Sequence, residues 1–380
     1  MPALPARRVP EPDRWVAYVD MDAFYVSCEL TSRPDLAGRP VIVGPDPARG
    51  PTRGVVLSAS YEARAFGVRS AQPAALAARL CPEAVWLPAD FPRYEAMAES
   101  VRAGLRRRSP RVVALSIDEA AVDCPASDAA GAERFAREIQ AALRAELGLP
   151  SSIGVATHRT VAKIASDRAK PGGVVVVPPD AIAAFLAPLP VGAIPGVGPK
   201  TRAVLESIGV ATVGALAEAP TSALRARLGG FGEELRRLAR GRPAPEVEVE
   251  HGPRSRSAAR TLPADSADRS ELDRDVTELA VGLAGSLAHE HLRYQTVTLA
   301  VRWTDFERVQ KSRSLPAAQS GPQALSTTAA RLLDELLAAE AGGRRRAVRA
   351  LSVGAERLVR EGARQRRLDE FGAGTALTVK

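Results

Sequence analysis

Two clusters of acidic residues each follow an apolar, β-branched stretch of the chain. Asp20 and Asp22 close the stretch WVAYVDMD, and Asp118 with Glu119 closes VVALSIDE. Carboxylates crowded at the ends of buried strands repel one another and resist ionisation unless cations hold them together. No basic residue lies beside either cluster, so the pattern predicts hard, oxygen-seeking ions such as Mg²⁺. Two such ions about 3.5 to 4 Å apart assist in-line displacement at phosphorus.

Each cluster alone also has a simpler explanation. An Asp or Glu that follows a strand is commonly a turn residue or a helix N-cap. The elements and motifs in the rest of the chain must therefore decide between the two.

The composition is that of an ordinary globular protein with a basic excess. At 380 residues the chain is long enough for two or more domains, and 46% apolar and 25% charged residues are usual values. The formal net charge of +8 favours a polyanionic partner. Cys28, Cys81 and Cys124 are far apart and form no CxxC pair, so we expect reduced, buried thiols in a cytoplasmic protein. No apolar run approaches the roughly 18 residues that cross a bilayer, so we expect no membrane partner.

From residue 15 to about 179, strand and helix patterns alternate. This order predicts an α/β catalytic body with a subdomain inserted over about 32–87. The predicted strands are 16–19, 41–43, 55–58, 112–117, 152–156 and 174–177. The predicted helices are 23–30, 72–80, 94–107, 132–147 and 160–169.

The next segment, about 180–242, has no strand pattern and predicts a helical domain. Its signature IPGVGPKTRAVLESIGV contains Gly196 and Gly198, which permit a tight hairpin, followed by Lys200. Backbone N–H groups at such a hairpin can approach phosphate at the start of the next helix. The segment looks like a helix-hairpin-helix that clamps a DNA backbone, although a plain glycine turn between two helices is the alternative.

A stretch containing Pro and Glu over 243–253 predicts a linker, and the elements then restart in the order β-α-β-β-α-β. Strands are expected at 255–262, 295–303, 308–315 and 347–353, and helices at 267–289 and 322–340. One face of this sheet would pack on the helices and the other would be free. Residues 254–367 contain 20 basic and 14 acidic residues, which favours a phosphate-contacting surface.

The motifs VDMDAFYVSCE, SASYEARAFGV, SIDEA and AKIASDRAKPGG, with the two modules that follow, resemble those of the Y-family DNA polymerases of the DNA polymerase IV type. The resemblance covers about residues 15–360, in the family's order and spacing. It implies an α+β multidomain, right-hand polymerase. The implied parts are a tail (1–14), palm (15–31 and 88–179), fingers (32–87), thumb with a helix-hairpin-helix (180–242), linker (243–253), βαββαβ little finger (254–360) and a second tail (361–380).

The resemblance also assigns the acidic residues. Asp20, Asp118 and Glu119 match the catalytic palm carboxylates that bind two Mg²⁺ ions, for which Mn²⁺ can substitute. The backbone carbonyl of Met21 matches a further metal ligand. Asp22 matches a supporting carboxylate.

Residues that would contact the substrates follow from the same match. Tyr25 matches the steric gate, a ring that leaves no room for the 2′-hydroxyl of a ribonucleotide. The positions that match contacts to the β and γ phosphates are Ser58, Tyr61, Arg64 and Lys170. Gly196, Gly198 and Lys200 fall in the hairpin that would bind DNA.

The implied function is template-directed addition of deoxynucleotides to a primer 3′ end by two-metal nucleotidyl transfer, with low fidelity and a role in translesion synthesis. Its partners would be primer-template DNA and deoxynucleoside triphosphates, and the enzyme would act as a monomer at the nucleoid. Gln365, Leu368 and Phe371 vaguely resemble a sliding-clamp peptide, a spacing that also arises easily in a charged tail. The chain departs from the family's pattern at Ala121, where an aromatic residue is usual, and in the strand SRSAARTLPADS.

Two other functions fit part of the pattern. A nucleotidyl cyclase also places two aspartates of a palm-like sheet on metal ions, but it needs neither a hairpin clamp nor a basic extra sheet. A catalytically silent DNA-binding paralogue would be expected to lack a carboxylate, whereas all are present.

Overall fold

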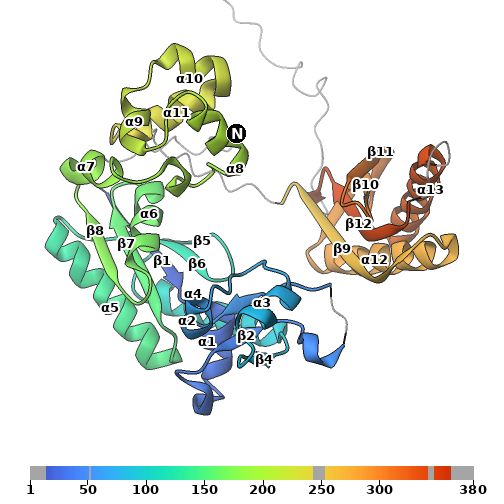
Figure 1. Ribbon diagram of the computed structural model, residues 1–380, viewed down its shortest axis with the longest axis horizontal. Helices are drawn as coiled ribbons and strands as arrows, with labels where there is room; N and C mark the ends of the chain where they lie inside the picture. The colour runs from blue at the N-terminus through green and yellow to red at the C-terminus, as the bar shows by residue number, and fades with distance from the viewer. Residues whose placement is uncertain (1–13, 51–52, 243–252, 341–345, 361–380) are drawn as a thin grey trace, which may run out of the picture. The chain divides into compact units, whose positions relative to one another are not determined.

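The computed structural model describes residues 14–50, 53–242, 253–340 and 346–360. The chain divides into two compact units, residues 1–248 and 249–380 (Figure 1). Each unit has a hydrophobic core of its own. The expected tails and linker, including Gln365, Leu368 and Phe371, lie outside the described residues apart from Arg14 and Pro253.

A five-stranded sheet forms the centre of the first unit. Its order is β5-β6-β1-β7-β8, so the first strand of the chain lies in the middle. β1 pairs antiparallel with β6 and β7, and β7 pairs parallel with β8. The strands are β1 (Trp15–Met21), β5 (Val112–Ala114), β6 (Glu119–Cys124), β7 (Ser151–Ala156) and β8 (Val174–Val177).

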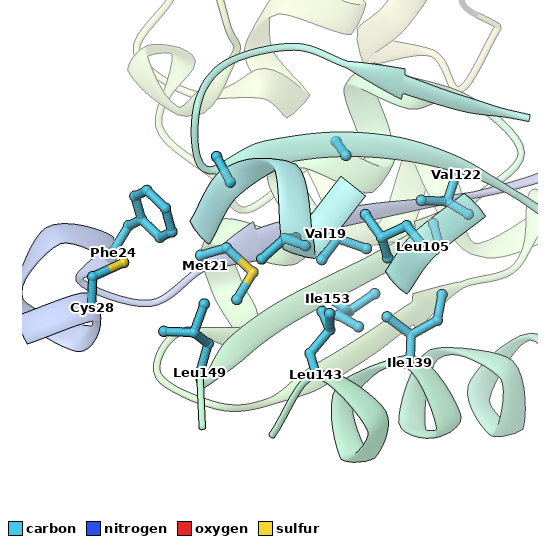
Figure 2. Packing of buried hydrophobic residues seen from close by; sticks show 14 of the residues in the cluster. Val19, Met21, Phe24, Cys28, Leu105, Val122, Ile139, Leu143, Leu149 and Ile153 are labelled. Carbon is cyan, nitrogen blue, oxygen red and sulfur yellow. The ribbon is translucent and has the colours of Figure 1, made fainter. Parts of the chain in front are cut away.

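Alternate side chains of β1 pack into two different cores. Val19 and Met21 face α4 (Phe91–Arg106) and α5 (Ala129–Leu147), in the cluster that Figure 2 shows around Leu105, Leu143 and Ile153. Tyr18 packs in the core on the opposite side, which α6 (Arg159–Ala169) covers. Because successive side chains of a strand point to opposite faces, Asp20 lies on the α6 side with Tyr18.

A smaller sheet, ordered β3-β2-β4, lies between residues 32 and 87. The strand predicted over 55–58 is displaced: β3 begins at Ser58, whereas Val55 and Val56 bond the loop before α3 at Pro73 and Gln72. The strand predictions also missed β4. The elements are α1 (Phe24–Leu30), which precedes the sheet, β2 (Val41–Val43), β3 (Ser58–Ala59), α2 (Tyr61–Ala65), α3 (Ala74–Leu80) and β4 (Val85–Leu87).

The segment that follows β8 is helical, as the sequence predicts. It packs in the same core as α6, through side chains such as Leu186, Leu205 and Leu224. Its helices are α7 (Ile182–Leu186), α8 (Pro199–Glu206), α9 (Val213–Glu218), α10 (Thr221–Leu228) and α11 (Gly230–Ala239). Short 3₁₀ turns lie at Pro34–Leu36, Pro47–Arg49, Pro179–Ala181 and Val191–Ala193.

The second unit has the predicted β-α-β-β-α-β order, with β13 added at the end. Its sheet is antiparallel, in the order β11-β10-β12-β9, and β13 pairs with β10. Both helices pack on the same side of the sheet, against alternate residues such as Val297, Leu299 and Val353. The elements are β9 (Ser255–Ser266), α12 (Arg269–His289), β10 (Leu292–Trp303), β11 (Arg308–Gln319), α13 (Pro322–Glu340), β12 (Val348–Glu356) and β13 (Val359–Arg360).

The state of the cysteines and the length of the helices bear on two further predictions. Cys28, Cys81 and Cys124 are buried free thiols, as expected. Among the described residues, every helix is too short or too polar to cross a membrane.

Candidate active site

Asp20 and Glu119 lie opposite one another on adjacent strands. The register of β1 and β6 pairs Asp20 with Glu119, and that of β1 and β7 pairs Asp20 with Ser152. Side chains paired in this way have Cβ atoms about 4.5 to 5.5 Å apart. Asp20 is only 3% exposed, so its carboxylate is largely removed from water. The sheet therefore brings the two acidic clusters of the sequence together.

Asp118 lies in the turn that joins β5 to β6. The Ser116 hydroxyl donates to its Oδ1 (2.6 Å), and the Met21 N–H donates to its carbonyl oxygen (2.9 Å). The buried strand expected over 112–117 is wrong, because β5 ends at Ala114 and is half exposed, and Glu119 begins the next strand. The Ser116 hydroxyl accepts from the Asp118 N–H in this turn, but the apolar Leu115 and Ile117 beside Ser116 make the run look like one strand.

Two lysines neutralise the buried carboxylates. Lys163 Nζ lies 2.6 Å from Glu119 Oε1 and 3.5 Å from Asp20 Oδ2, while Lys170 Nζ lies 2.7 Å from Asp20 Oδ1. The expectation that nothing basic lies beside the acidic clusters is therefore wrong for the folded chain, although it holds for neighbours in the sequence. The reason is that α6 and the turn after it bring these lysines from a distant part of the sequence.

The two carboxyl groups respond differently to this environment. Burial raises the pKa of Asp20 to about 6, against the opposing effect of the Lys170 and Lys163 ammonium groups. Burial also opposes ionisation of Glu119, but the hydrogen bond and the charge of Lys163, together with hydrogen bonds from Tyr18 and Asp20, outweigh it and hold the pKa of Glu119 below its usual value. Glu119 is thus the more firmly ionised of the pair.

A glycine sets the distance between α6 and the sheet. A Cβ added to Gly154 of β7 would lie 2.0 Å from the Ala162 carbonyl oxygen and 2.2 Å from the Ser166 nitrogen. The Ser166 hydroxyl also donates to the Ser152 carbonyl oxygen (3.0 Å). Only glycine permits this approach, which carries Lys163 to the acidic pair.

Asp22 is buried (2% exposed) beside the acidic pair and is occupied by hydrogen bonds. Its carboxylate accepts from the Tyr61 hydroxyl (3.0 Å), the Ser152 hydroxyl (2.9 Å) and the Gly172 N–H (2.9 Å). These contacts join β1 to α2, to β7 and to the turn after Lys170.

The residues expected to grip phosphate form a connected group. Arg64 lies over the Tyr61 ring, with its guanidinium carbon 4.7 Å from the ring centroid, and its Nε donates to the Ala59 carbonyl oxygen (3.0 Å). Ser58 is buried on β3, three residues before Tyr61. Through Asp22 and Lys170, this group lies close to the acidic pair.

Tyr25 on α1 belongs to an aromatic cluster. Its ring centroid lies 4.7 Å from that of Tyr94 and 6.1 Å from that of Phe91, both on α4. Tyr94 is fully buried, and its hydroxyl donates to Glu29 Oε1 (2.6 Å). The cluster holds the half-buried Tyr25 ring against α4, a support that the sequence analysis missed.

Ala121, at a position where the sequence resemblance leads us to expect an aromatic residue, lies beside the aromatic Tyr18. The two residues are direct partners on β6 and β1, and both lie on the α6 side of the sheet. The small side chain of Ala121 leaves room for the Tyr18 ring, which lies 5.0 Å from Lys163 Nζ. The Tyr18 hydroxyl also hydrogen bonds to Glu119.

Sequence reasoning missed Tyr18, Ser152 and Lys163. The sequence contains one signal for Lys163: Asp167 follows it by four residues, the spacing of an ion pair on one side of a helix.

The donors at this site suit a hard divalent ion. Asp20, Asp118 and Glu119 offer carboxylate oxygens, which Mg²⁺ prefers, and the sheet places two of them side by side. In the described residues, no three acidic, His or Cys side chains converge as a ready-made metal cage, since Asp118 bonds to Ser116. The residues therefore fit such an ion in their chemistry, and the pairing of Asp20 with Glu119 also fits it in position.

An apolar hollow of about 470 Å³ lies beside the small sheet. Leu57, Trp86 and Ala89 line it, together with the backbone of Gly44. Leu57 directly precedes Ser58, so the hollow adjoins the residues expected to grip phosphate. The sequence analysis did not anticipate it.

The glycine hairpin lies just before α8. Gly196 has a positive φ of 89°, which favours glycine, and Gly198 is the N-cap of α8. A Cβ added to Gly198 would meet no atom within 4 Å, so internal packing does not require a glycine there. Lys200 is exposed on the first turn of the helix.

The open face of the second sheet is polar but only weakly charged. Alternation along the strands places small side chains such as Ser257, Thr298 and Ser312 on it, with Arg302 and Arg308 at one end. On the helix side, basic residues pair with acidic ones: Arg256 with Glu290, Arg260 with Asp275 and Glu278, and Lys311 and Arg313 with Glu335. Much of the positive charge counted in the sequence is therefore neutralised within the unit.

Comparisons with known proteins cover most of the chain. Family models match residues 19–167 (impB/mucB/samB family), 179–210 (IMS family HHH motif) and 253–368 (impB/mucB/samB family C-terminal domain). DNA polymerase IV of Methanoculleus marisnigri is 43% identical over 361 residues, which are 94% of this chain and 98% of that protein. DNA polymerase IV of Halorhodospira halophila is 40% identical, over 95% of this chain and 99% of that protein.

Solved structures have the same fold. A Y-family DNA polymerase chimera, Dbh-Dpo4(243-245)-Dbh, superposes with a TM-score of 0.83 at 25% identity and covers 91% of this chain and 99% of its own. An insertion ternary complex of Dbh DNA polymerase, at 24% identity and a TM-score of 0.62 with the same coverage, supports the fold alone.

Proposed function

The chain belongs to the impB/mucB/samB family and is a translesion DNA polymerase of the Y family, and we propose that it works by two-metal nucleotidyl transfer with low fidelity. The observation that carries the proposal is the pairing of Asp20 with Glu119 across β1 and β6, with Asp118 in the adjoining turn.

Asp20, Asp118 and Glu119 would hold the ions, together with the backbone carbonyl of Met21. Bound Mg²⁺ or Mn²⁺ would lower the pKa of the primer hydroxyl and stabilise charge on the phosphate oxygens. Asp118 is the carboxylate that must move, because its present partner is Ser116 in the same turn. Lys163 contacts Oε1 of Glu119, so Glu119 would offer its other carboxylate oxygen to an ion.

The triphosphate would be gripped by Ser58, Tyr61, Arg64 and Lys170. The guanidinium of Arg64 can pair with two phosphate oxygens, whereas the Lys170 ammonium acts as a point charge. Both lie beside the acidic pair through the contacts of Tyr61 and Asp20. Tyr25, supported by Tyr94, would exclude ribonucleotides by occupying the space that a 2′-hydroxyl needs.

We assign the parts of the right hand as the sequence divides them: palm 15–31 and 88–179, fingers 32–87, thumb 180–242 and little finger 254–360. The apolar hollow beside Leu57 suits the flat face of a base in the fingers. The thumb hairpin, with Gly196, Gly198 and Lys200, would approach backbone phosphates. The small hydroxyl side chains on the open face of the little finger would let a DNA backbone lie close to the sheet.

The proposal extends to the partners of the enzyme and to its location. The enzyme would bind primer-template DNA and deoxynucleoside triphosphates as a monomer and act at the nucleoid in the cytoplasm. Its C-terminal tail would bind a sliding clamp through Gln365, Leu368 and Phe371.

Primer extension with one labelled deoxynucleotide at a time tests the central proposal. Wild-type protein should add the nucleotide that the template directs, and Asp118→Ala should lose most of this activity while it remains folded. Asp180→Ala, a change at an exposed residue away from the site, is the matched control and should extend normally. Unchanged extension by Asp118→Ala would refute the mechanism. Formation of cyclic nucleotide without template would favour a cyclase, and DNA binding without extension would favour a silent paralogue.

A further inference from the structure

The three groups that contact the Asp22 carboxylate all donate hydrogen bonds to it. The Tyr61 hydroxyl donates to Oδ1, the Ser152 hydroxyl lies within reach of both carboxylate oxygens, and the Gly172 N–H donates to Oδ2. These partners lie 39, 130 and 150 residues away along the chain. A single buried side chain thus joins three distant segments of the catalytic unit.

A carboxylate accepts from all three groups in their present orientations. An ionised carboxyl group offers two acceptor oxygens and no donor, whereas the amide of Asn would turn an NH₂ group toward at least one of the donors. A buried donor left without an acceptor destabilises its own position substantially. The present arrangement therefore matches the charge and the acceptor pattern of Asp22 as well as its shape, and an amide would force the Tyr61 or Ser152 hydroxyl to turn and accept.

Two of the segments held by Asp22 carry phosphate-gripping residues. Tyr61 lies under the Arg64 guanidinium, so fixing the Tyr61 ring also limits where Arg64 can lie. Gly172 is two residues after Lys170, and the Gln140 amide holds the same turn by donating to the Gly172 carbonyl oxygen (3.0 Å). The turn is thus fixed at its N–H by Asp22 and at its carbonyl by Gln140.

We infer that Asp22 is a positioning residue for the incoming triphosphate: its carboxylate holds Tyr61 and the Gly172 turn, and through them Arg64 and Lys170, without binding metal itself. The inference rests on the proposed polymerase function and deepens it. Three protein donors already share the two carboxylate oxygens, so Asp22 acts on nucleotide binding, whereas Asp20, Asp118 and Glu119 act on the metal ions.

Asp22→Asn provides the first test. The KM for the correct deoxynucleoside triphosphate should rise about tenfold or more, since charge-assisted hydrogen bonds are lost, and kcat should fall much less. The Mg²⁺ concentration for half-maximal activity should stay within about twofold of the wild-type value. Binding of a fluorescent deoxynucleoside triphosphate to a complex with a dideoxy-terminated primer should weaken by the same factor as KM. An unchanged KM, or a large rise in the Mg²⁺ requirement, would overturn the inference.

A matched control separates this role from a general effect of losing a charge. Asp90 caps α4 and accepts from a single backbone donor, the Arg93 N–H (3.2 Å), which an amide oxygen can also serve. Asp90→Asn should therefore leave KM unchanged. A rise in KM for Asp90→Asn equal to that for Asp22→Asn would overturn the inference.

A double-mutant cycle tests the connection to Tyr61 and does not depend on one variant. Tyr61→Phe removes the hydroxyl that donates to Asp22, so the effects of Tyr61→Phe and Asp22→Asn on KM should be less than multiplicative when combined. Multiplicative effects would refute a shared role. If Asp22→Asn does not fold, as shown by circular dichroism, Ser152→Ala takes its place, and a KM equal to that of wild type would overturn the inference. Absence of extension by the wild-type protein would instead refute the proposed function.

Discussion

The close approach at Gly154 supports a quantitative prediction about the active site. Gly154→Ala places a Cβ 2.0 Å from the Ala162 carbonyl oxygen and 2.2 Å from the Ser166 nitrogen, both backbone atoms that cannot rotate away. Ordinary contacts need roughly 3.4 Å, so relief of the 2.0 Å contact requires α6 to recede by about 1.4 Å. That shift would lengthen the 2.6 Å contact between Lys163 and Glu119 to about 4.0 Å, beyond the reach of a hydrogen bond.

Two measurements follow from this displacement. Overpacking against backbone should lower the free energy of unfolding of the catalytic unit by about 3 kcal/mol, the upper part of the usual range. Nucleotide incorporation per folded molecule should also fall, because Lys163 no longer holds Glu119 in place. Urea unfolding followed by circular dichroism measures the first effect, and single-turnover primer extension measures the second.

Gly104→Ala is the matched control in the same unit. Gly104 lies within α4, and an added Cβ would meet Leu143 at an ordinary 3.5 Å. Alanine is the better helix former, so this variant should be more stable by about 0.5 to 1 kcal/mol and should keep full activity. A free energy of unfolding for Gly154→Ala within about 0.5 kcal/mol of wild type would refute the packing argument.

Three further predictions concern the gate, the DNA contacts and the departure at position 121. Tyr25→Ala should raise ribonucleotide incorporation relative to deoxynucleotide by at least about tenfold in single-nucleotide extension, and unchanged discrimination would exclude a gate. Affinity for primer-template DNA, measured by fluorescence anisotropy, should fall steeply between about 50 and 200 mM salt and vary little with sequence, whereas a flat response would exclude backbone binding. Ala121→Phe should destabilise the catalytic unit by about 1 to 3 kcal/mol in urea, because its ring would collide with Tyr18, and adding Tyr18→Ala should restore part of the loss.

The sequence predicted the types of most elements because their periodicity is local. The helices that became α4, α5 and α6 were placed to within a few residues, and so was the β-α-β-β-α-β order of the second unit. Short elements were harder, because β3 and α2 contain too few residues to show a period. The reversal before Glu119 was missed because the turn residues Ser116 and Asp118 alternate with the apolar Leu115 and Ile117, so the run does not reveal where the strand ends.

The electrostatics of the site depend on contacts that sequence order hides. Lys163 and Glu119 are 44 residues apart, and two partners of Asp22, Ser152 and Gly172, are farther still. No local pattern relates such residues, so the neutralisation of Asp20 could not be predicted. The same limit applies to the second unit, where only the sheet register shows that Arg260 faces the acidic residues of α12 and not the open face.

The alternation along β1 restricts how this enzyme can change through evolution. Val19 and Met21 point into the core against α4 and α5, while Asp20, between them, points toward Glu119. Inserting or deleting a single residue in this strand would move the apolar side chains to the α6 side and the carboxylate into the core against α4 and α5, so it would destroy the core and the site together. Changes in chain length are therefore confined to loops, and lineages can adapt the template and nucleotide contacts there while this strand keeps its length.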